Sequence, residues 1–144
     1  MFLSDVSDRG AMPALIKTLA FNEARLRMIA ENVANADTPG YRAKQLNVDA
    51  FRQALGEALT ARRTDPSRPF VVESGGEVAT LADGSLRITP SEKPVDNVLF
   101  HDGTNVSVER EMADLAQTGM THELATALLR DRVHRLQTAI RGTV

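Results

Sequence analysis

The chain has 144 residues, the length of one domain, and no cysteine, which excludes disulfides and thiolate metal ligands. Its 17 basic and 19 acidic side chains give a formal net charge of -2, so the basic excess typical of nucleic-acid binding is missing. Only 4% of the residues are aromatic, which disfavours stacking platforms for bases or sugars. No segment is apolar for long enough to span a bilayer, and we expect no cleavable signal peptide.

Residues 12–35 have the pattern of one long helix. Apolar side chains recur at alternating steps of three and four, which places them on one helix face. Pro13 suits the first turn, where a missing N–H costs little. Asn22 interrupts the apolar series and either fixes the helix register or is exposed without consequence. The apolar residues that we predict to form an assembly seam here are Leu15, Leu19, Leu26, Ile29 and Val33.

A polar run follows this helix, in which Pro39 disfavours helical geometry at the preceding residue and so ends the helix. The Pro-Gly pair predicts a tight turn with Gly40 at positive φ. Asparagines at the helix end can bond the last carbonyls or the turn backbone. An ordinary helix end explains part of this pattern, and a special interaction role is the alternative. The residues that stand out are Asn32, Asn35, Thr38, Pro39, Gly40 and Tyr41.

The middle of the chain, residues 64–105, contains four prolines and four glycines, a density that excludes a long helix. Short β-prone pieces remain at 70–72, 78–81 and 86–88, and the turn residues 82–85 could join the last two in a hairpin. An isolated hairpin is marginal in water. We therefore expect this segment to be mobile in the free subunit and ordered by contacts with other molecules.

Residues 107–141 repeat the alternation of three and four and predict a second long helix. Acidic residues are concentrated in its first half and arginines in its second half, as the helix dipole favours. Ser107 is predicted as the N-cap and Gly142 as the stop. Gly119 is either a bend or tolerated defect, or a place where a neighbouring helix approaches closely. The seam residues predicted here are Met112, Leu115, Leu129, Val133, Leu136 and Ile140.

These elements predict a mainly α fold. The long N- and C-terminal helices pair as an antiparallel, coiled-coil-like hairpin, and the middle is irregular with a short β-hairpin. We divide the chain into 1–63 (helix and polar run), 64–105 (variable middle) and 106–144 (C-terminal helix), which together form one assembly domain. Two helices alone cannot enclose a core, so we expect a marginal monomer that association completes.

Residues that could support catalysis are sparse. His122 and His134 lack a metal-binding helical spacing, and we expect His122 to pack rather than to bind a metal; His101 is the remaining histidine. No serine has a nucleophile-elbow context, and no glycine-rich loop precedes a helix in phosphate-binding form. Arg62 and Arg63 are expected to be solvated linker charges. We predict no enzyme activity, no cofactor, no metal site and neither nucleic acid nor a small-molecule substrate as a partner.

The polar run resembles the N-terminal signature of the bacterial flagellar axial proteins, Asn-x-x-Asn-x-x-Thr-Pro-Gly-Tyr, at all six fixed positions. Residues 106–113 resemble the start of that family's C-terminal helix. The Ala36-Asp37 variant and residues 140–142 look most like the short proximal rod members, whereas hook and distal rod members carry large inserted domains. The similarity covers roughly 12–52 and 104–142, and it departs at 119–122, where relatives tend to carry larger side chains.

The resemblance implies a structural subunit of the flagellar basal body, which forms the proximal rod by helical polymerisation and is required for motility. It implies export by the flagellar type III apparatus without signal cleavage, and a place in the periplasmic rod. The partners implied are other rod proteins, the adapter at the membrane ring, the export apparatus and further copies of the chain. A different short rod subunit is the first alternative, and a non-polymerising coiled-coil adaptor or secreted protein is the second.

Overall fold

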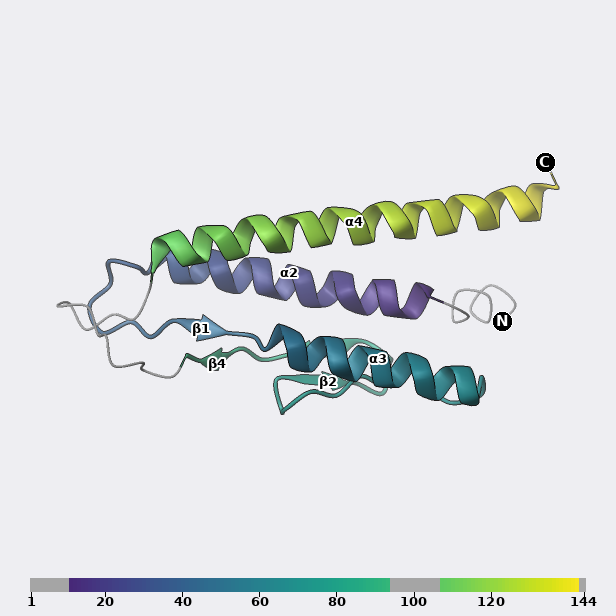
Figure 1. The fold of residues 1–144 in the computed structure, drawn as a ribbon, viewed down its shortest axis with the longest axis horizontal. Helices are drawn as coiled ribbons and strands as arrows, with labels where there is room; N and C mark the ends of the chain where they lie inside the picture. The colour runs from purple at the N-terminus through teal and green to yellow at the C-terminus, as the bar shows by residue number, and fades with distance from the viewer. Residues whose placement is uncertain (1–10, 94–106, 143–144) are drawn as a thin grey trace.

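The computed structural model describes residues 11–93 and 107–142 (Figure 1). Within these ranges the long helices predicted at both ends are confirmed. The helices are α2 (Met12–Ala34), α3 (Val48–Thr64) and α4 (Val108–Arg141). The strands are β1 (Lys44–Gln45), β2 (Val78–Thr80), β3 (Leu86–Ile88) and β4 (Ser91–Glu92).

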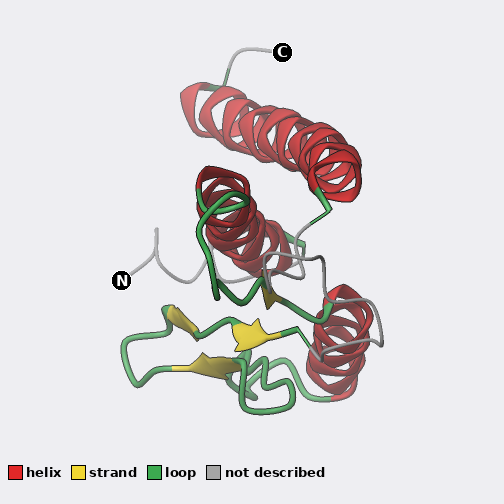
Figure 2. Cartoon of the chain, turned by 90° about the vertical axis from the view of Figure 1, so that its left-hand side faces the viewer, coloured by secondary structure: helices red, strands yellow, loops and turns green. Residues whose placement is uncertain are grey.

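The elements form three layers, with α2 between α4 on one side and α3 with the strands on the other (Figures 1 and 2). Helices α2 and α4 run antiparallel along their shared length, which confirms the predicted mainly α hairpin of terminal helices. Because α4 has 34 residues and α2 has 23, the last turns of α4 extend past the first turn of α2. Gly142, at φ 65°, ends α4 as predicted.

Helix α3 was not predicted as a separate element. The Asn47 side chain accepts a hydrogen bond from the amide of Ala50 at 2.9 Å, which caps the first turn. Asp49 at the start and Arg62 and Arg63 at the end complement the helix dipole. The buried face of α3 carries Phe51, Ala54 and Ala58. Helix α3 therefore provides a second packing partner for α2, which the sequence did not predict.

The predicted hairpin is confirmed as β2 and β3, which pair antiparallel in the register Val78↔Ile88 and Thr80↔Leu86. The Leu81 amide donates to the Ser85 carbonyl at 2.9 Å, which closes the turn. Lys17 of α2 is buried and donates from Nζ to the Gly84 carbonyl in this turn. Burial lowers the pKa of Lys17, and the nearby Asp83 opposes that shift.

A second antiparallel pair joins β1 to β4, with Lys44 opposite Glu92 and Gln45 opposite Ser91. The β-prone piece at 70–72 forms no strand. Its Val72 backbone instead bonds the Thr80 side chain at 2.9 and 3.1 Å. The β1–β4 pair places the segment after the polar run beside the segment that leads toward α4.

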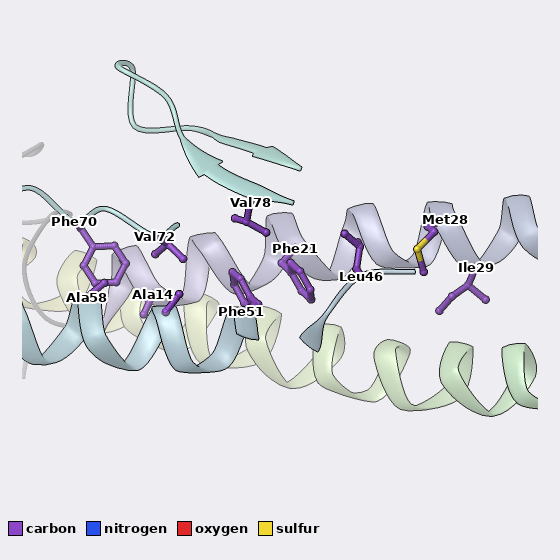
Figure 3. Close-up of a cluster of buried hydrophobic side chains, with 11 residues drawn as sticks. Ala14, Phe21, Met28, Ile29, Leu46, Phe51, Ala58, Phe70, Val72 and Val78 are labelled. Carbon is purple, nitrogen blue, oxygen red and sulfur yellow. The ribbon is translucent and has the colours of Figure 1, made fainter. Parts of the chain in front are cut away.

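The core lies mainly between α2 and the layer of α3 and the hairpin (Figure 3). The rings of Phe21 and Phe51 stack with centroids 4.0 Å apart. The sequence analysis considered burial within the subunit by the two terminal helices and assigned the rest to association, whereas α3 and the middle segment cover the second face of α2. The predicted mobility of 64–105 in the free subunit stays a prediction, although several side chains within 70–78 are buried in the core. Residues 94–106 lie outside the described residues. The core contributors from the middle segment are Phe70, Val72 and Val78.

Candidate assembly site

Asn32, in the last turn of α2, uses its whole hydrogen-bonding capacity inside the protein. Its Nδ2 donates to the Lys44 carbonyl at 2.9 Å and to Glu111 Oε2 at 3.1 Å. Its Oδ1 accepts from the Lys44 amide at 2.9 Å and from the Tyr41 hydroxyl at 3.1 Å. The side chain is fully buried, and the four bonds match the two donors and two acceptor sites of a primary amide. Asn32 therefore fixes the returning chain against the end of its own helix.

Glu111 continues this arrangement into the first turn of α4. Its side chain is 1% exposed, and it pairs with Lys93 as well as accepting from Asn32. A buried carboxylate is costly unless it is paired and hydrogen-bonded, and both conditions hold here. Arg25 of α2 and Asp114 of α4 add an ion pair at 3.1 Å. We use the term polar cluster for Asn32, Tyr41, Lys44, Lys93 and Glu111, which joins α2, the β1–β4 pair and α4.

The surroundings of Tyr41 raise the pKa of its phenol. Burial is the main cause, the carboxylates of Glu31 and Glu111 act in the same direction, and the Lys44 ammonium opposes them. Glu31 also bonds the Lys44 ammonium, and this hydrogen bond raises the pKa of Lys44. Tyr41 is therefore protonated at neutral pH and donates to Asn32.

The remaining motif residues form an exposed turn. The Asn35 side-chain amide donates to the Glu31 carbonyl at 2.9 Å. The backbone amides of Thr38 and Tyr41 donate to the carbonyls of Asn35 and Thr38, which closes two further turns. Gly40 has φ 75°, as predicted. Thr38, Pro39 and Gly40 are exposed, so the motif has a buried part at Asn32 and Tyr41 and a solvent-facing tip.

The predicted seam residues divide into two groups within the subunit. Ile29 is buried, whereas Met112, Val133 and Ile140 are exposed, so a role of these three in an assembly seam stays a prediction. The most buried α4 positions, Glu111, Thr118 and Ala125, recur every seven residues, one residue before the predicted frame at Met112. The reason is that Glu111 is drawn to Asn32, which turns Met112 outward. The half-buried seam residues are Leu15, Leu19, Leu26, Val33, Leu115, Leu129 and Leu136.

Helix α4 also carries large apolar side chains that α2 does not cover. Met120 lies two residues from the buried Thr118, which places it on nearly the opposite side of the helix. Extended exposed apolar surface in a folded protein marks an interaction site. We call this set the α4 apolar surface: Met112 (50% exposed), Met120 (71%), Leu124 (61%) and Leu128 (48%). Ile140 (66% exposed) lies about 160° around the helix from Leu124, on the side of Ala125, and is a separate exposed position.

The described residues show no catalytic or metal-binding arrangement. No group of three or more His, Cys, Asp or Glu residues in 11–93 and 107–142 could hold a metal ion. His134 is exposed, His122 is half-buried with an Nδ1 that has no partner in the described part of the chain, and His101 lies outside it. None of the described helices has the length and apolarity to cross a membrane.

Sequence reasoning missed Lys93 and Glu111, two of the three charged members of the polar cluster. Neither has a local signature, because Glu111 reads as an ordinary acidic residue in a first helical turn. One signal was present: Glu111, Thr118 and Ala125 share a seven-residue spacing with small or polar members. Such a frame is hard to recognise when Met112 beside it offers a larger apolar side chain.

Comparison with known proteins gives a consistent result. Residues 12–42 match the family described as "Flagella basal body rod protein". The flagellar basal body rod protein FlgB of Cereibacter sphaeroides is 30% identical over 88% of this chain and 90% of its own length. The FlgB proteins of Bacillus subtilis (24% identity, 92% of this chain and 95% of that protein) and Salmonella typhimurium (23%, 88% and 89%) are also similar.

The matched region of the family contains α2 and the polar run, including Asn32 and Tyr41. The FlgB relatives extend the similarity across nearly the whole chain, α4 included. Because the identity reaches 30% over nine tenths of a relative, the family is established. The chain belongs to the FlgB family of flagellar basal body rod proteins and is a structural subunit of the flagellar basal body.

Proposed function

We propose that this chain forms part of the proximal rod by packing its two terminal helices against neighbouring subunits, and that motility depends on this packing. The single observation that carries the proposal is the α4 apolar surface. A helix that buries one face against α2 while exposing methionine and leucine on the other is suited to a second helix partner.

The energetics favour repeated contacts. Each large apolar side chain contributes about 1.5–3 kcal/mol when a neighbour buries it completely. Met120 and Leu124 retain most of their exposure in the subunit, so most of that gain is still available to an interface. One such contact gives a small net binding free energy once the cost of association is subtracted, whereas many contacts in a lattice add up.

The two groups of seam residues then have different roles. Ile29, Leu26 and Leu115 hold α2 against α4, and Met112, Val133 and Ile140 face neighbouring subunits. We propose that residues 1–63, 64–105 and 106–144 act together as one assembly domain. The neighbours we propose are other rod proteins, further copies of the chain and the adapter at the membrane ring. Delivery by the flagellar type III apparatus without signal cleavage belongs to the same proposal.

The test compares one chemical change on two surfaces. Leu124→Asp places a charge on the α4 apolar surface, and Leu81→Asp places the same charge at the exposed hairpin turn. Each variant is returned to a strain that lacks the chain, and swimming and the number of complete basal bodies are measured. We expect Leu124→Asp to reduce basal bodies at least tenfold and Leu81→Asp to support normal numbers.

The purified variants should both retain the helical circular dichroism of the unchanged chain, since both sites are exposed. Normal assembly with Leu124→Asp would refute the role of α4. Fractionation separates the remaining class of function, because an adaptor stays in the cytosol while a rod subunit copurifies with basal bodies. Complete motors in the strain without the chain would refute the proposed function itself.

A further inference from the structure

A cavity of about 600 Å³ lies where α3 ends and α2 begins. In Figure 1 this end of α2 and α3 is opposite the end where α4 begins. The walls of the cavity come from Ala11 beside the start of α2, the last turns of α3 and the second half of α4. Its charged lining consists of three arginines, Arg62, Arg63 and Arg132. The volume is in the range of cavities that bind ligand-sized groups.

No residue within 11–93 and 107–142 makes an ion pair with Arg62, Arg63 or Arg132. By contrast, Arg25 and Arg135 each pair with an aspartate. Three guanidinium groups around one space repel one another, and Arg62 is partly withdrawn from water. Arg62 and Arg63 lie in the last turn of α3 and not in a linker, and Arg63 is exposed as expected for a solvated charge.

The start of α2 adds positive potential to the same cavity. Ala11, at the N-cap position, offers no side-chain hydrogen bond, and the first turn contains no acidic residue. The helix dipole of α2 therefore favours an anion at this end. The helix end alone would mean little, but here it adds to the three arginines of α3 and α4.

We propose that this cavity receives a carboxylate-bearing segment of a different subunit of the basal body. The inference depends on the proposed function, since it assumes that this chain packs against other subunits. Guanidinium groups bind carboxylates through two parallel hydrogen bonds, which gives orientation as well as attraction. A segment with two or three clustered acidic side chains would match the charge of the cavity.

Two occupants from this chain are the alternatives. Residues 1–10 contain Asp5 and Asp8 but also Arg9, so their side chains carry one net negative charge against three guanidinium groups. A second copy offers residues 94–109, which contain Asp96, Asp102 and Glu109 without Lys or Arg. Its whole sequence has a net charge of only -2, so a more strongly acidic partner gives the larger attraction.

The experiment reverses the charge of the cavity in cells. Arg62→Glu with Arg63→Glu is compared with Arg52→Glu with Arg87→Glu, which makes the same total charge change at exposed arginines elsewhere. We expect at least tenfold fewer basal bodies for the cavity variant and a change below twofold for the control. Both purified variants should unfold at the temperature of the unchanged chain within a few degrees.

The partner is identified with a photo-crosslinking amino acid at position 63 in otherwise unchanged cells. We expect an adduct with another basal-body protein, in a peptide containing Asp or Glu. Changing those acidic residues to Lys should restore assembly of the Arg62→Glu, Arg63→Glu variant.

Normal assembly of the cavity variant would overturn the inference. An adduct confined to residues 1–10 or to a second copy would also overturn it. The same holds if no protein adduct forms and the chain instead binds phosphatidylglycerol vesicles in a way that depends on Arg62 and Arg63. A strain that swims without the chain would instead refute the proposed function. A non-motile deletion strain that the cavity variant restores refutes this inference alone.

Discussion

The two ends of the α2–α4 pair differ in how completely the chain satisfies its own polar groups. At the end of α2, all four hydrogen-bonding positions of Asn32 are used, and the buried Glu111 is paired with Lys93. At the start of α2, the N-cap is an alanine and three arginines line an open cavity. The subunit therefore satisfies its own polar groups at the end of α2. At the start of α2, the three arginines have no ion-pair partner among the described residues.

This difference suggests a division of labour along the helix pair. The polar cluster sets the angle at which the chain returns from α2 and the register in which α4 begins. The opposite end, where α4 extends past α2 with Ile140 mostly exposed, can adapt to whatever lies beside it. Local opening should therefore be least frequent at the polar cluster and more frequent toward the end of α4.

Removal of the Asn32 side chain should produce the largest loss. Asn32→Ala leaves the Lys44 amide and carbonyl, the Tyr41 hydroxyl and Glu111 Oε2 without this partner. Because each buried unpaired group costs about 1–3 kcal/mol, we expect a free energy of unfolding lower by about 3 kcal/mol or more. Urea denaturation of the purified subunit measures this.

Asn35→Ala is the matched control, since it removes a bond to the Glu31 carbonyl at a more solvent-accessible position of the same motif. Its expected cost is below about 1 kcal/mol. Equal losses for the two variants would show that the polar cluster does not hold this end together.

A substitution at the exposed tip of the motif should have an intermediate effect. Gly40 has φ 75°, and a Cβ built there meets nothing within 4 Å. The cost of Gly40→Val is therefore backbone strain, about 1–2 kcal/mol in the free energy of unfolding. Gly40→Asn should cost less, because asparagine tolerates the left-handed region. A Val variant as stable as the Asn variant would mean that the tip relaxes freely.

These sites also show what the sequence could and could not predict. Local rules predicted the bounds of α2 and α4, the β2–β3 hairpin and the positive φ of Gly40, since each depends on neighbours along the chain. The predicted α4 residues Leu115, Leu129 and Leu136 are half-buried, but the burial of Glu111 beside them depends on its contact with Asn32, 79 positions away, which no local rule predicts. Gly119 has no neighbour within 4 Å of a built Cβ in the described part of the subunit, so none of the helices α2, α3 and α4 approaches it closely.

Helix α3 was missed for a different reason. Its N-cap and charge pattern are present in the sequence, but its buried face has a single large apolar side chain, Phe51, beside Ala54 and Ala58, so its apolar periodicity is weak. The cavity could not be predicted, because Arg132 joins Arg62 and Arg63 only through the antiparallel return of α4. Long-range placement of ordinary surface residues has no local sequence signal.

The smallest predicted effect tests the start of α2 directly. Ala11→Asp places a carboxylate at the start of α2 and beside the arginine cavity. Interaction with the helix dipole and the arginines should raise the free energy of unfolding by about 0.5–1 kcal/mol. Ala11→Asn has nearly the same shape without the charge, and urea denaturation at pH 7 compares the two. The pH dependence is measured at low salt, where screening is weakest. The gain in the free energy of unfolding should disappear as the pH falls through the pKa of the new carboxyl, because the protonated form no longer interacts with the positive charges. If Asp and Asn were equally stable at pH 7, the start of α2 would not be electropositive, and the contrast between the two ends would be lost. If Ala11→Asp stabilises the subunit but lowers basal-body numbers, the positive charge at the start of α2 is needed for assembly even though it lowers the stability of the isolated subunit.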